Sequence, residues 1–576
     1  MSAMPGDVRP PSLDVLPPLL QRGRTSHSPF PRLHIRDVAV FGALMSVFAL
    51  ALKPVVDNDL FWHLATGRYI WATGHIPLSD PFSWTVPGCR WIAHEWLTEL
   101  WLYPLYTHGG YGALMLAFAA IITAAFALTY GTARSLGATR PWAVAITLLA
   151  AVACAHTWGV RPQMVSMAFM ALTLRLLLPG PKVTTARARP EGRPAAIHGP
   201  VPAMTLQAVI GSLGTPVRHA LRRLRALPGV WLLIPLMALW ANMHGGFIFG
   251  LALIGAFAAG ESAWAIWCAL NNDAEVTYAR AVRLWQVFAF GTAACLLTPN
   301  GLAGLIYPFS YLGDNASTRY ISEWVSPDFH KFQYHFFEAL LLALVVGLAG
   351  LARRPAVVPG LRRVPYLTQA LLLVAFTHLA LDSVRNINLF SVIVAPFIAA
   401  YLSGSWRNLV EVMSRPRRAP ATATPLPPVR AALNFGLAAF IVAAVLIARA
   451  PDLTYARNVA AQARIFPTRA VSYIKAHRIP GPLLNSYDWG GYLIWTLYPR
   501  LRVYVDGRPD MYGDRFMDAF IRTWQAQPGW QQTLRERGVV SVLVEPTSGL
   551  AHALAGTPGW RLIYHDSVAV LYERAT

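Results

Sequence analysis

Apolar segments long enough to cross a membrane recur along this chain. A helix needs about 20 residues to cross roughly 30 Å of hydrocarbon. Eleven segments come close to this length: 37–56, 110–132, 141–157, 162–179, 229–243, 246–269, 280–298, 336–352, 364–381, 387–404 and 431–449. Charged residues make up only 13% of the 576 residues, whereas a soluble domain has about 25%. We therefore predict a polytopic α-helical membrane protein with about 11 transmembrane helices.

The loops between these segments differ in charge, and this difference orients the helices. Residues 1–36 and the loop 180–228 are rich in Arg and contain few acids. Loops rich in Lys and Arg remain in the cytoplasm, so both segments are predicted to be cytoplasmic. An odd number of spans then places residues 450–576 outside. The same bias accounts for the net charge of +21, so we expect membrane lipids and not nucleic acid as partners.

The chain changes character after residue 450. Strands are predicted at 482–486, 501–505, 539–544 and 560–573, and helices at 467–478 and 515–537. Short strands between helices are typical of a small α/β domain, and about 125 residues can bury a core of their own. The predicted domains are a basic N-terminal segment (1–36), a membrane domain (37–449) and an extracytoplasmic α/β domain (450–576). The inner membrane of a bacterium fits this pattern, and the last domain is then periplasmic.

Two acids directly follow the first predicted span. Asp57 and Asp59 open the first external loop, 57–108. Carboxylates at the edge of a bilayer need water, a cation or a hydrogen-bond donor. One of them can serve as a general base and the pair can bind a divalent cation. The alternative is the start of an interfacial helix, where the helix dipole favours acids.

Other polar candidates lie in or beside the outer loops. Arg385 opens a late span at its outer end, where a guanidinium suits a phosphate because it can bind two oxygens at once. Its alternative role is snorkelling to the interface. Arg161 is a second candidate for phosphate. The remaining candidates are Glu95, His63, His94 and His244. For His244 the alternative is a hydrogen-bonded histidine of the core.

The first external loop continues from the two acids into an amphipathic helix over 60–71. A second amphipathic helix is predicted to carry His94, Glu95 and Glu99. This order resembles the GT-C superfamily of integral-membrane glycosyltransferases, which begin with one span, an acidic motif and interfacial helices. Members of that superfamily use a lipid-linked sugar donor at the outer or lumenal face.

Two further motifs resemble those of the oligosaccharyltransferase catalytic subunit, a GT-C member. The loop 299–335 contains Y-I-S-E-W, similar to a loop motif whose Glu touches the acceptor. The tail contains N-S-Y-D-W-G-G, similar to the S-W-W-D-Y-G motif, although the double Trp is absent. The resemblance implies that the acceptor binds at Glu323, Trp324, Asp488 and Trp489.

The resemblance also implies a reaction. The chain is expected to move a sugar from a polyprenyl-phosphate-linked donor to an acceptor at the outer face. Asp57, Asp59 and Glu95 would be catalytic, and Arg385 and Arg161 would hold the donor phosphate. A divalent cation, Mg²⁺ or Mn²⁺, would bind at Asp57 and Asp59. The second acidic metal motif of the family has no counterpart here, because no carboxylate lies between the third and fourth spans.

Two other functions remain open from the sequence. A transporter or flippase of a lipid-linked substrate needs polar groups near the middle of the membrane, and Glu261 is the main candidate for such a group. A noncatalytic envelope-assembly protein would instead use its outer domain to bind a partner.

Overall fold

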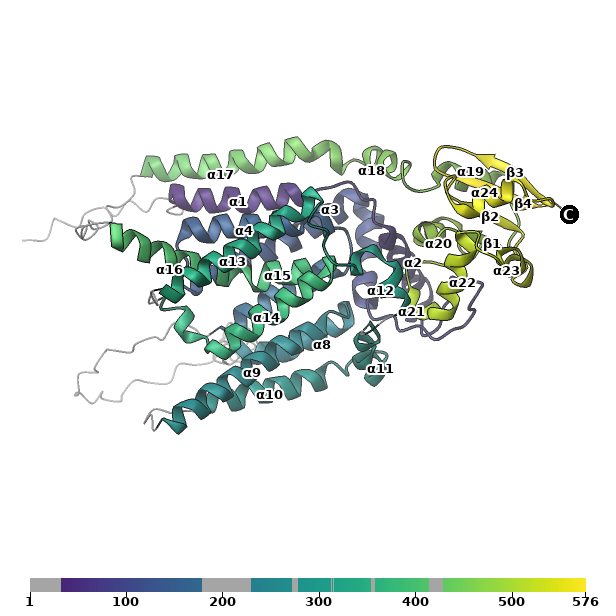
Figure 1. Ribbon diagram of the computed structural model, residues 1–576. Coiled ribbons are helices and arrows are strands. Elements are labelled where there is room, and N and C mark those ends of the chain that lie inside the picture. Colours follow the sequence, from purple (N-terminus) through teal and green to yellow (C-terminus); the bar gives the residue numbers. More distant parts are fainter. Residues whose placement is uncertain are drawn as a thin grey trace, which may run out of the picture.

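The computed structural model describes residues 33–178, 229–271, 278–311, 313, 315–353, 358–413 and 428–575. Long helices lie side by side at one end of the molecule, and the strands of the C-terminal segment lie at the other end (Figure 1). Most of the basic segment 1–36 and almost the whole loop 180–228 lie outside the described residues, so their predicted cytoplasmic location stays a prediction.

Helices occupy every segment that was predicted to span the membrane. They are α1 (Ile35–Ala51), α3 (Trp96–Ser135), α4 (Arg140–Cys154), α5 (Gln163–Leu177), α8 (Leu233–Met243), α9 (Phe247–Leu270), α10 (Ala279–Ala294), α13 (His335–Arg353), α14 (Tyr366–Asp382), α15 (Ile387–Ile393), α16 (Ala395–Met413) and α17 (Pro428–Arg449). Their apolar character follows directly from the sequence, since a helix that satisfies its own backbone hydrogen bonds is the stable form of such a segment in lipid.

Fewer of these helices pass a strict test for membrane spans. Within the described residues, five are long and apolar enough to cross a membrane, or six if α15 and α16, bent by 51°, count as one span. The count of eleven is therefore not confirmed, because several apolar helices are shorter than 18 residues. Only 6% of the most apolar stretch of α17 is buried inside the protein. A helix this apolar and this exposed needs lipid around it, and the chain is a multi-pass membrane protein.

The first external loop contains two helices that lead back into the membrane. Helix α2 (Asn58–Thr73) confirms the predicted helix over 60–71. Helix α3 joins the second loop helix to the following span across a break at Gly110, whose φ of 60° favours glycine. The sequence predicted His94 and Glu95 on this second helix. Because α3 begins at Trp96, they lie instead in the turn before it.

The C-terminal segment forms a small four-stranded sheet with helices. Its strands are β1 (Leu483–Asn485), β2 (Ser541–Val544), β3 (Trp560–His565) and β4 (Val570–Arg574), in the order β1-β2-β4-β3. Strands β1 and β2 are parallel, and the other two pairs are antiparallel. The helices are α18 (Tyr455–Gln462), α19 (Thr468–Ala476), α20 (Gly490–Leu497), α21 (Pro509–Tyr512), α22 (Asp514–Trp524), α23 (Trp530–Glu536) and α24 (Gly549–Ala555). The predicted small sheet is confirmed.

One predicted strand of this segment is wrong. Residues 501–505 form no strand, and Val503 makes a single bridge with Ser83 of the first external loop. The N–H of Trp84 donates to the carbonyl of Val503 at 3.1 Å, and the N–H of Val503 donates to the carbonyl of Phe82 at 3.1 Å. The apolar pattern at 501–505 thus reflects packing against another segment and not membership of the sheet.

The C-terminal segment shares its hydrophobic core with the first external loop. Phe61, Trp62, Phe82 and Trp91 of the loop pack in one buried cluster with the apolar residues of the tail. The expectation that the tail buries a core of its own is therefore corrected. Loop and tail form one unit at the end of the helix bundle (Figure 1), and this unit carries the polar motifs.

A buried ion-pair cluster holds the loop and the tail together. Arg508 donates from Nη2 to Asp80 Oδ1 at 2.9 Å and to Asp506 Oδ2 at 2.6 Å. Side-chain exposure is 3% for Arg508 and 0% for both acids. Asp80 belongs to the loop, and Asp506 to the tail. Removing one partner of such a cluster is expensive, because it leaves a buried charge uncompensated.

Candidate functional site

A cavity of about 470 Å³ lies where the helix bundle meets the loop–tail unit. Ten of the predicted site residues line it: Asp57, Asp59, His63, His94, Glu95, Arg161, Glu323, Trp324, Arg385 and Asp488. They come from the first loop, the start of α5, the loop before α13, the start of α15 and the tail. The structure thus brings these separate motifs together around one cavity.

Asp57 caps helix α2 and pairs with Arg161. Its Oδ1 accepts from the backbone N–H of Asp59 at 3.0 Å, and its Oδ2 accepts from Arg161 Nε at 2.5 Å. Gly159 permits this approach, because a Cβ at that position would collide with the Asp57 carboxylate. Both oxygens of Asp57 are thus engaged, and the helix-capping alternative from the sequence describes its place correctly.

Arg161 connects Asp57 to Glu323. Its Nη1 donates to Glu323 Oε1 at 2.6 Å. Burial alone would lower the pKa of Arg161, but the two carboxylates raise it far above its usual range. Burial alone would also raise the pKa of Glu323, but Arg161 and Arg385 hold it below its usual value. The predicted phosphate-binding role does not fit Arg161, because its guanidinium already neutralises two acids.

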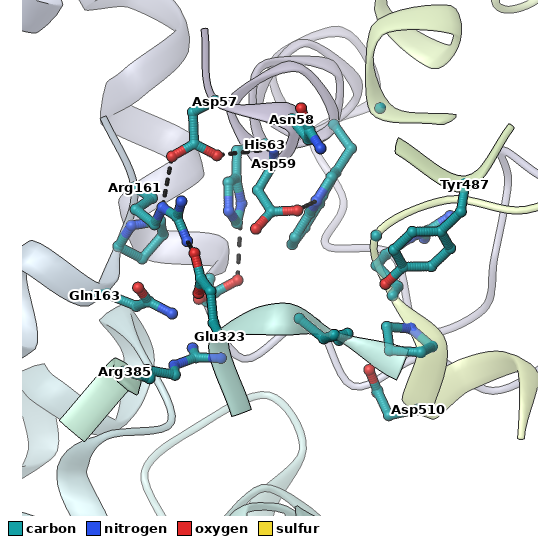
Figure 2. Close-up of a pocket in the computed structure, with 18 of the residues that line it drawn as sticks. Asp57, Asn58, Asp59, His63, Arg161, Gln163, Glu323, Arg385, Tyr487 and Asp510 are labelled. Atoms are coloured by element: carbon teal, nitrogen blue, oxygen red, sulfur yellow. Dashed lines mark hydrogen bonds and ion pairs between the residues drawn. The ribbon is translucent and has the colours of Figure 1, made fainter. Parts of the chain in front are cut away.

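Asp59 lies between the two walls of the cavity. In Figure 2 the ion-paired side chains of Asp57, Arg161 and Glu323 form one wall. Tyr487 and Asp510 lie opposite. One oxygen of Asp59 accepts from Trp62 Nε1 at 3.3 Å. Burial, with the nearby charge of Asp57, raises the pKa of Asp59 to about 7. A carboxylate with a pKa near neutrality is suited to general base catalysis.

Arg385 faces the cavity without a carboxylate partner. Its neighbours are the side-chain amide of Gln163, whose oxygen is placed to accept from the guanidinium, and the ring of Trp324, 5.2 Å from the guanidinium carbon. Among the described residues, no acid lies within ion-pair distance of Arg385. The side chains in direct contact with Arg385 are neutral and leave its guanidinium available to hydrogen-bond an anion in the cavity. Its position directly before α15 agrees with the predicted place at the outer end of a late helix.

Glu95 lies among three histidines at the inner side of the cavity. Its Oε1 lies 3.7 Å from His94 Nε2 and 3.6 Å from His244 Nε2, and its Oε2 lies 3.7 Å from His63 Nδ1. Burial raises the pKa of Glu95 to about 8, and burial lowers the pKa of each histidine. The three rings are therefore neutral at neutral pH.

His244 does not line the cavity. Its Nδ1 accepts from the backbone N–H of Gly246 at 2.9 Å and lies 2.8 Å from Ser166 Oγ. A neutral ring with an accepting Nδ1 carries its proton on Nε2, which faces Glu95. The prediction of a hydrogen-bonded core histidine thus describes its burial, and its contact with Glu95 connects it to the site.

The acceptor candidates divide into two groups. Trp324 lies parallel to Tyr311, with ring centres 5.4 Å apart, and Asp488 Oδ1 accepts from Asn58 Nδ2 at 3.3 Å. Trp489 lies elsewhere: it is 2% exposed, and its indole N–H donates to the carbonyl of Ile465 at 3.0 Å. The aromatic residue of this motif that lines the cavity is Tyr487.

Sequence reasoning missed the acid on the far wall. Asp510 lies in the cavity and accepts from the hydroxyl groups of Tyr307 at 2.7 Å and Tyr311 at 3.2 Å. The two tyrosines are one helical turn apart in the loop before α13. That spacing was the available signal, but nothing in the sequence joins it to an acid about 200 residues later.

The pair Asp57 and Asp59 does not fit the predicted divalent cation as it stands. A cation shared by the two carboxylates would have to take Asp57 Oδ2 from Arg161. Another group of ligand atoms lies deeper, where His63, Glu95 and Glu99 approach one another.

A second cavity of about 630 Å³ adjoins the first across Val56, Asp57 and Arg161. Its wall is mostly apolar and includes Met115, Phe118 and Ile122 of α3. Besides Arg161, its cations are Lys53, Arg457 and Arg464. An apolar space beside a polar one suits a molecule that has a lipid part and a charged part.

Comparison with known proteins gives similarity in structure alone. Neither a protein-family model nor a curated protein matches the sequence. An oligosaccharyltransferase of Archaeoglobus fulgidus, tethered with an acceptor peptide, is similar with a TM-score of 0.49 and 13% identity, over 94% of this chain and 74% of that one. ArnT of Cupriavidus metallidurans, bound to undecaprenyl phosphate, gives 0.41 and 14%, over 93% and 97%.

A third similar structure is the arabinofuranosyltransferase AftD from Mycobacteria, with a TM-score of 0.45 and 16% identity, over 95% of this chain and 40% of that one. Identities this low assign no roles to residues of this chain. These three similarities concern the fold alone.

Proposed function

We propose that this protein is a glycosyltransferase that moves a sugar from a polyprenyl-phosphate-linked donor to an acceptor at the outer face of a bacterial inner membrane. The observation that carries the proposal is that Asp59 and Arg385 line the same cavity at the end of an apolar bundle. The first is a carboxylate with a pKa near 7, and the second is a guanidinium that pairs with no acid in the part of the chain that the structure describes. They supply a base for the acceptor and a cation for the leaving phosphate.

The reaction needs one bond to form and one to break. The acceptor hydroxyl gives its proton to Asp59 as its oxygen attacks the anomeric carbon. The bond from that carbon to the phosphate oxygen breaks, and polyprenyl phosphate leaves with the electron pair. Arg385 stabilises the charge that grows on this phosphate, and such electrostatic effects are usually the largest single contribution to catalysis. Direct displacement inverts the anomeric centre.

Asp57, Arg161 and Glu323 keep this arrangement in place. The ion pairs join the start of α2, the start of α5 and the loop before α13. Asp57 also fixes the first turn of α2, and Asp59 lies in that turn. These residues position the base and the wall of the cavity. None of the three transfers a proton in this reaction.

The adjoining apolar cavity supports a lipid-linked donor. It opens beside α3, one of the helices long enough to span the membrane. A polyprenyl chain in that space would reach the polar cavity at the wall that Asp57 and Arg161 form. The cations of the second cavity, Lys53 above all, are the competing candidates for the phosphate.

The features that would favour a transporter are weaker in the structure than in the sequence. Glu261, the mid-span acid, is paired with Arg280 at 2.6 Å. The acids of the site, among them Asp57, Asp59 and Glu323, instead lie together around one cavity (Figure 2). A noncatalytic assembly protein would not need a base and an available cation in one cavity.

Binding and breakdown of lipid-linked substrates test the proposal. A charge-assisted hydrogen bond contributes about 1.5–3 kcal/mol, so Arg385→Ala should raise the dissociation constant for undecaprenyl phosphate by roughly ten- to hundredfold. Arg385→Lys should have a smaller effect, because Lys offers only a point charge. Lys53→Ala is the matched control, and its affinity should stay close to that of the wild type.

The wild-type protein should also release sugar from undecaprenyl-phosphate-linked hexoses in nanodiscs. A flippase or an assembly protein would leave these donors intact. Equal affinities of the three Arg385 forms would reduce Arg385 to an interfacial anchor. Loss of affinity in Lys53→Ala alone would move the phosphate to the second cavity.

A further inference from the structure

Three ligand atoms converge at the inner side of the cavity. His63 of α2, Glu95 before α3 and Glu99 of α3 present a ring nitrogen and carboxylate oxygens that all lie within 4.8 Å of one another. His63 Nδ1 lies 3.0 Å from Glu99 Oε1 and 3.7 Å from Glu95 Oε2. All three side chains are buried. Ligand atoms around a tetrahedral zinc ion lie roughly 3.4 Å apart at the usual metal–ligand distances, so the two spacings from His63 are close to those around one ion.

Glu99 supplies an independent sign of a missing partner. Its side chain is 1% exposed, and its Oε2 has no hydrogen-bond partner among the described residues. A buried carboxylate oxygen without a partner is costly. The other oxygen of the same carboxylate is the one that faces His63.

Among the described residues, no basic side chain other than histidine pairs with the two acids of the cluster. Glu95 and Glu99 lie together, and within the described part of the chain neither has an Arg or Lys nitrogen within ion-pair distance. Of the nearby arginines, Arg508 binds Asp80 and Asp506, and Arg161 binds Asp57 and Glu323. Arg385 acts on Glu95 only from beyond ion-pair distance. A divalent cation would compensate two carboxylates at once.

The surrounding histidines suit such an ion as outer partners. His244 carries its proton on Nε2, because its Nδ1 accepts from Gly246, and Nε2 faces Glu95 Oε1 at 3.6 Å. It can orient Glu95 as a ligand. Partners of this kind fix the direction of metal-binding carboxylates and are part of most metal sites.

We propose that His63, Glu95 and Glu99 bind one zinc or manganese ion at the inner side of the cavity, with an open coordination position toward the cavity. One imidazole with two carboxylates is a ligand set for zinc or manganese and is harder to reconcile with magnesium, which prefers oxygen ligands and water. Three protein ligands with one open position are typical of accessible zinc sites. This site is separate from Asp57 and Asp59 and does not depend on the proposed transfer reaction.

The competing occupant is a proton. Without an ion, the hydrogen bond between His63 Nδ1 and Glu99 Oε1 holds the cluster together. An ion and a proton differ in two measurable ways: only the ion is counted by elemental analysis, and only the ion makes the melting temperature depend on added metal.

The test uses the full-length protein in detergent. It is first dialysed against a chelator and then titrated with ZnCl₂ and, separately, MnCl₂. Bound metal is counted by mass spectrometry of the elements, and thermal unfolding is followed in the same samples. The wild type should bind about one ion per chain and melt at a higher temperature with it.

Four variants localise the ion. Glu99→Gln keeps the shape of the side chain and should weaken binding by more than the roughly 10- to 100-fold that loss of an outer partner costs. His63→Gln is the second ligand variant, in case the first does not fold. Glu261→Gln removes a buried acid that pairs with Arg280 and should bind like the wild type. Asp59→Asn should do the same.

Each other outcome overturns the proposal. A wild type that binds neither metal shows that the cluster holds a proton. Retention of the ion by both ligand variants shows that it binds adventitiously elsewhere. Loss of the ion in Asp59→Asn alone returns it to the pair of acids at the start of α2.

Discussion

Replacing Arg508 with Met should separate the first external loop from the tail. Arg508 is 3% exposed and is the only ion-pair partner, among the described residues, of both Asp80 and Asp506, which are fully buried. Its guanidinium also lies 4.4 Å from the centre of the Trp91 ring. Met fills part of the same volume but leaves two buried carboxylates without a cation.

The contact between loop and tail should lose about 3–5 kcal/mol of stability, the range for removing one partner of a buried pair. Since 1.4 kcal/mol is a factor of ten, the population of the opened form should rise by roughly a hundred- to several-thousandfold. The loss of stability should lie toward the lower end of its range, because both acids keep other hydrogen bonds. Asp80 keeps its hydrogen bonds from Ser83, and Asp506 keeps the one from Tyr512 at 2.7 Å.

Limited proteolysis measures this opening directly, because cleavage follows the population of the open form when closing is fast. The matched control is Arg561→Met, which removes an exposed pair with Glu573 in the same segment. An exposed pair contributes about 0–1 kcal/mol. If the Arg508 variant were cleaved no faster than this control, the idea that the buried cluster holds loop and tail together would be refuted.

Three further predictions follow from the site and the fold. The rate of transfer should fall about tenfold per pH unit below pH 7, because Asp59 must be deprotonated to accept a proton and its raised pKa lies near 7; a rate that stays constant from pH 5 to 8 would exclude it as the base. Trp489→Phe should lower the melting temperature without changing acceptor affinity, since the indole binds the carbonyl of Ile465 and not the cavity; a selective change in acceptor affinity would restore its predicted role. Single Cys replacements at the exposed Ser135 and Gln531 should be labelled from opposite sides of the membrane, inside and outside respectively; labelling from one side would contradict the topology.

Much of the architecture could be predicted because lipid imposes a simple rule. Apolar segments must form helices there, so helices lie at every predicted span. The limits of those segments were harder to predict. The break at Gly110 joins a loop helix to a span, and the bend between α15 and α16 divides another. Hydropathy does not report where a helix bends.

The candidate site was predictable where residues lie next to a helix end in the outer loops. Asp57, Asp59, Arg161 and Arg385 all do so, and all four line the cavity. Their partners could not be foreseen, because ion pairs such as that of Asp57 with Arg161 join segments about 100 residues apart. The same limit hid Asp510, which binds two tyrosines from a distant loop.

The tail was the segment in which local patterns misled most. The residues at 501–505 look like a strand because they are apolar, but they pack on the first external loop. Glycines at 491 and 507 mark the same interface. A Cβ at Gly491 would lie 2.5 Å from the carbonyl oxygen of Asn58, and one at Gly507 would lie 2.5 Å from Asp59 Oδ1. These close approaches account for the glycines in the tail motifs.

Release of labelled sugar from undecaprenyl-phosphate hexoses by Asp59→Asn tests the central claim most directly. Asn keeps the size of Asp59 and its contact with Trp62, so the fold should survive, which the melting temperature checks. At pH 8 the variant should release sugar at least roughly 10²-fold more slowly than the wild type, the loss expected when a general base is removed. A folded variant that releases sugar within about threefold of the wild-type rate would contradict the account, because a lost base should cost far more.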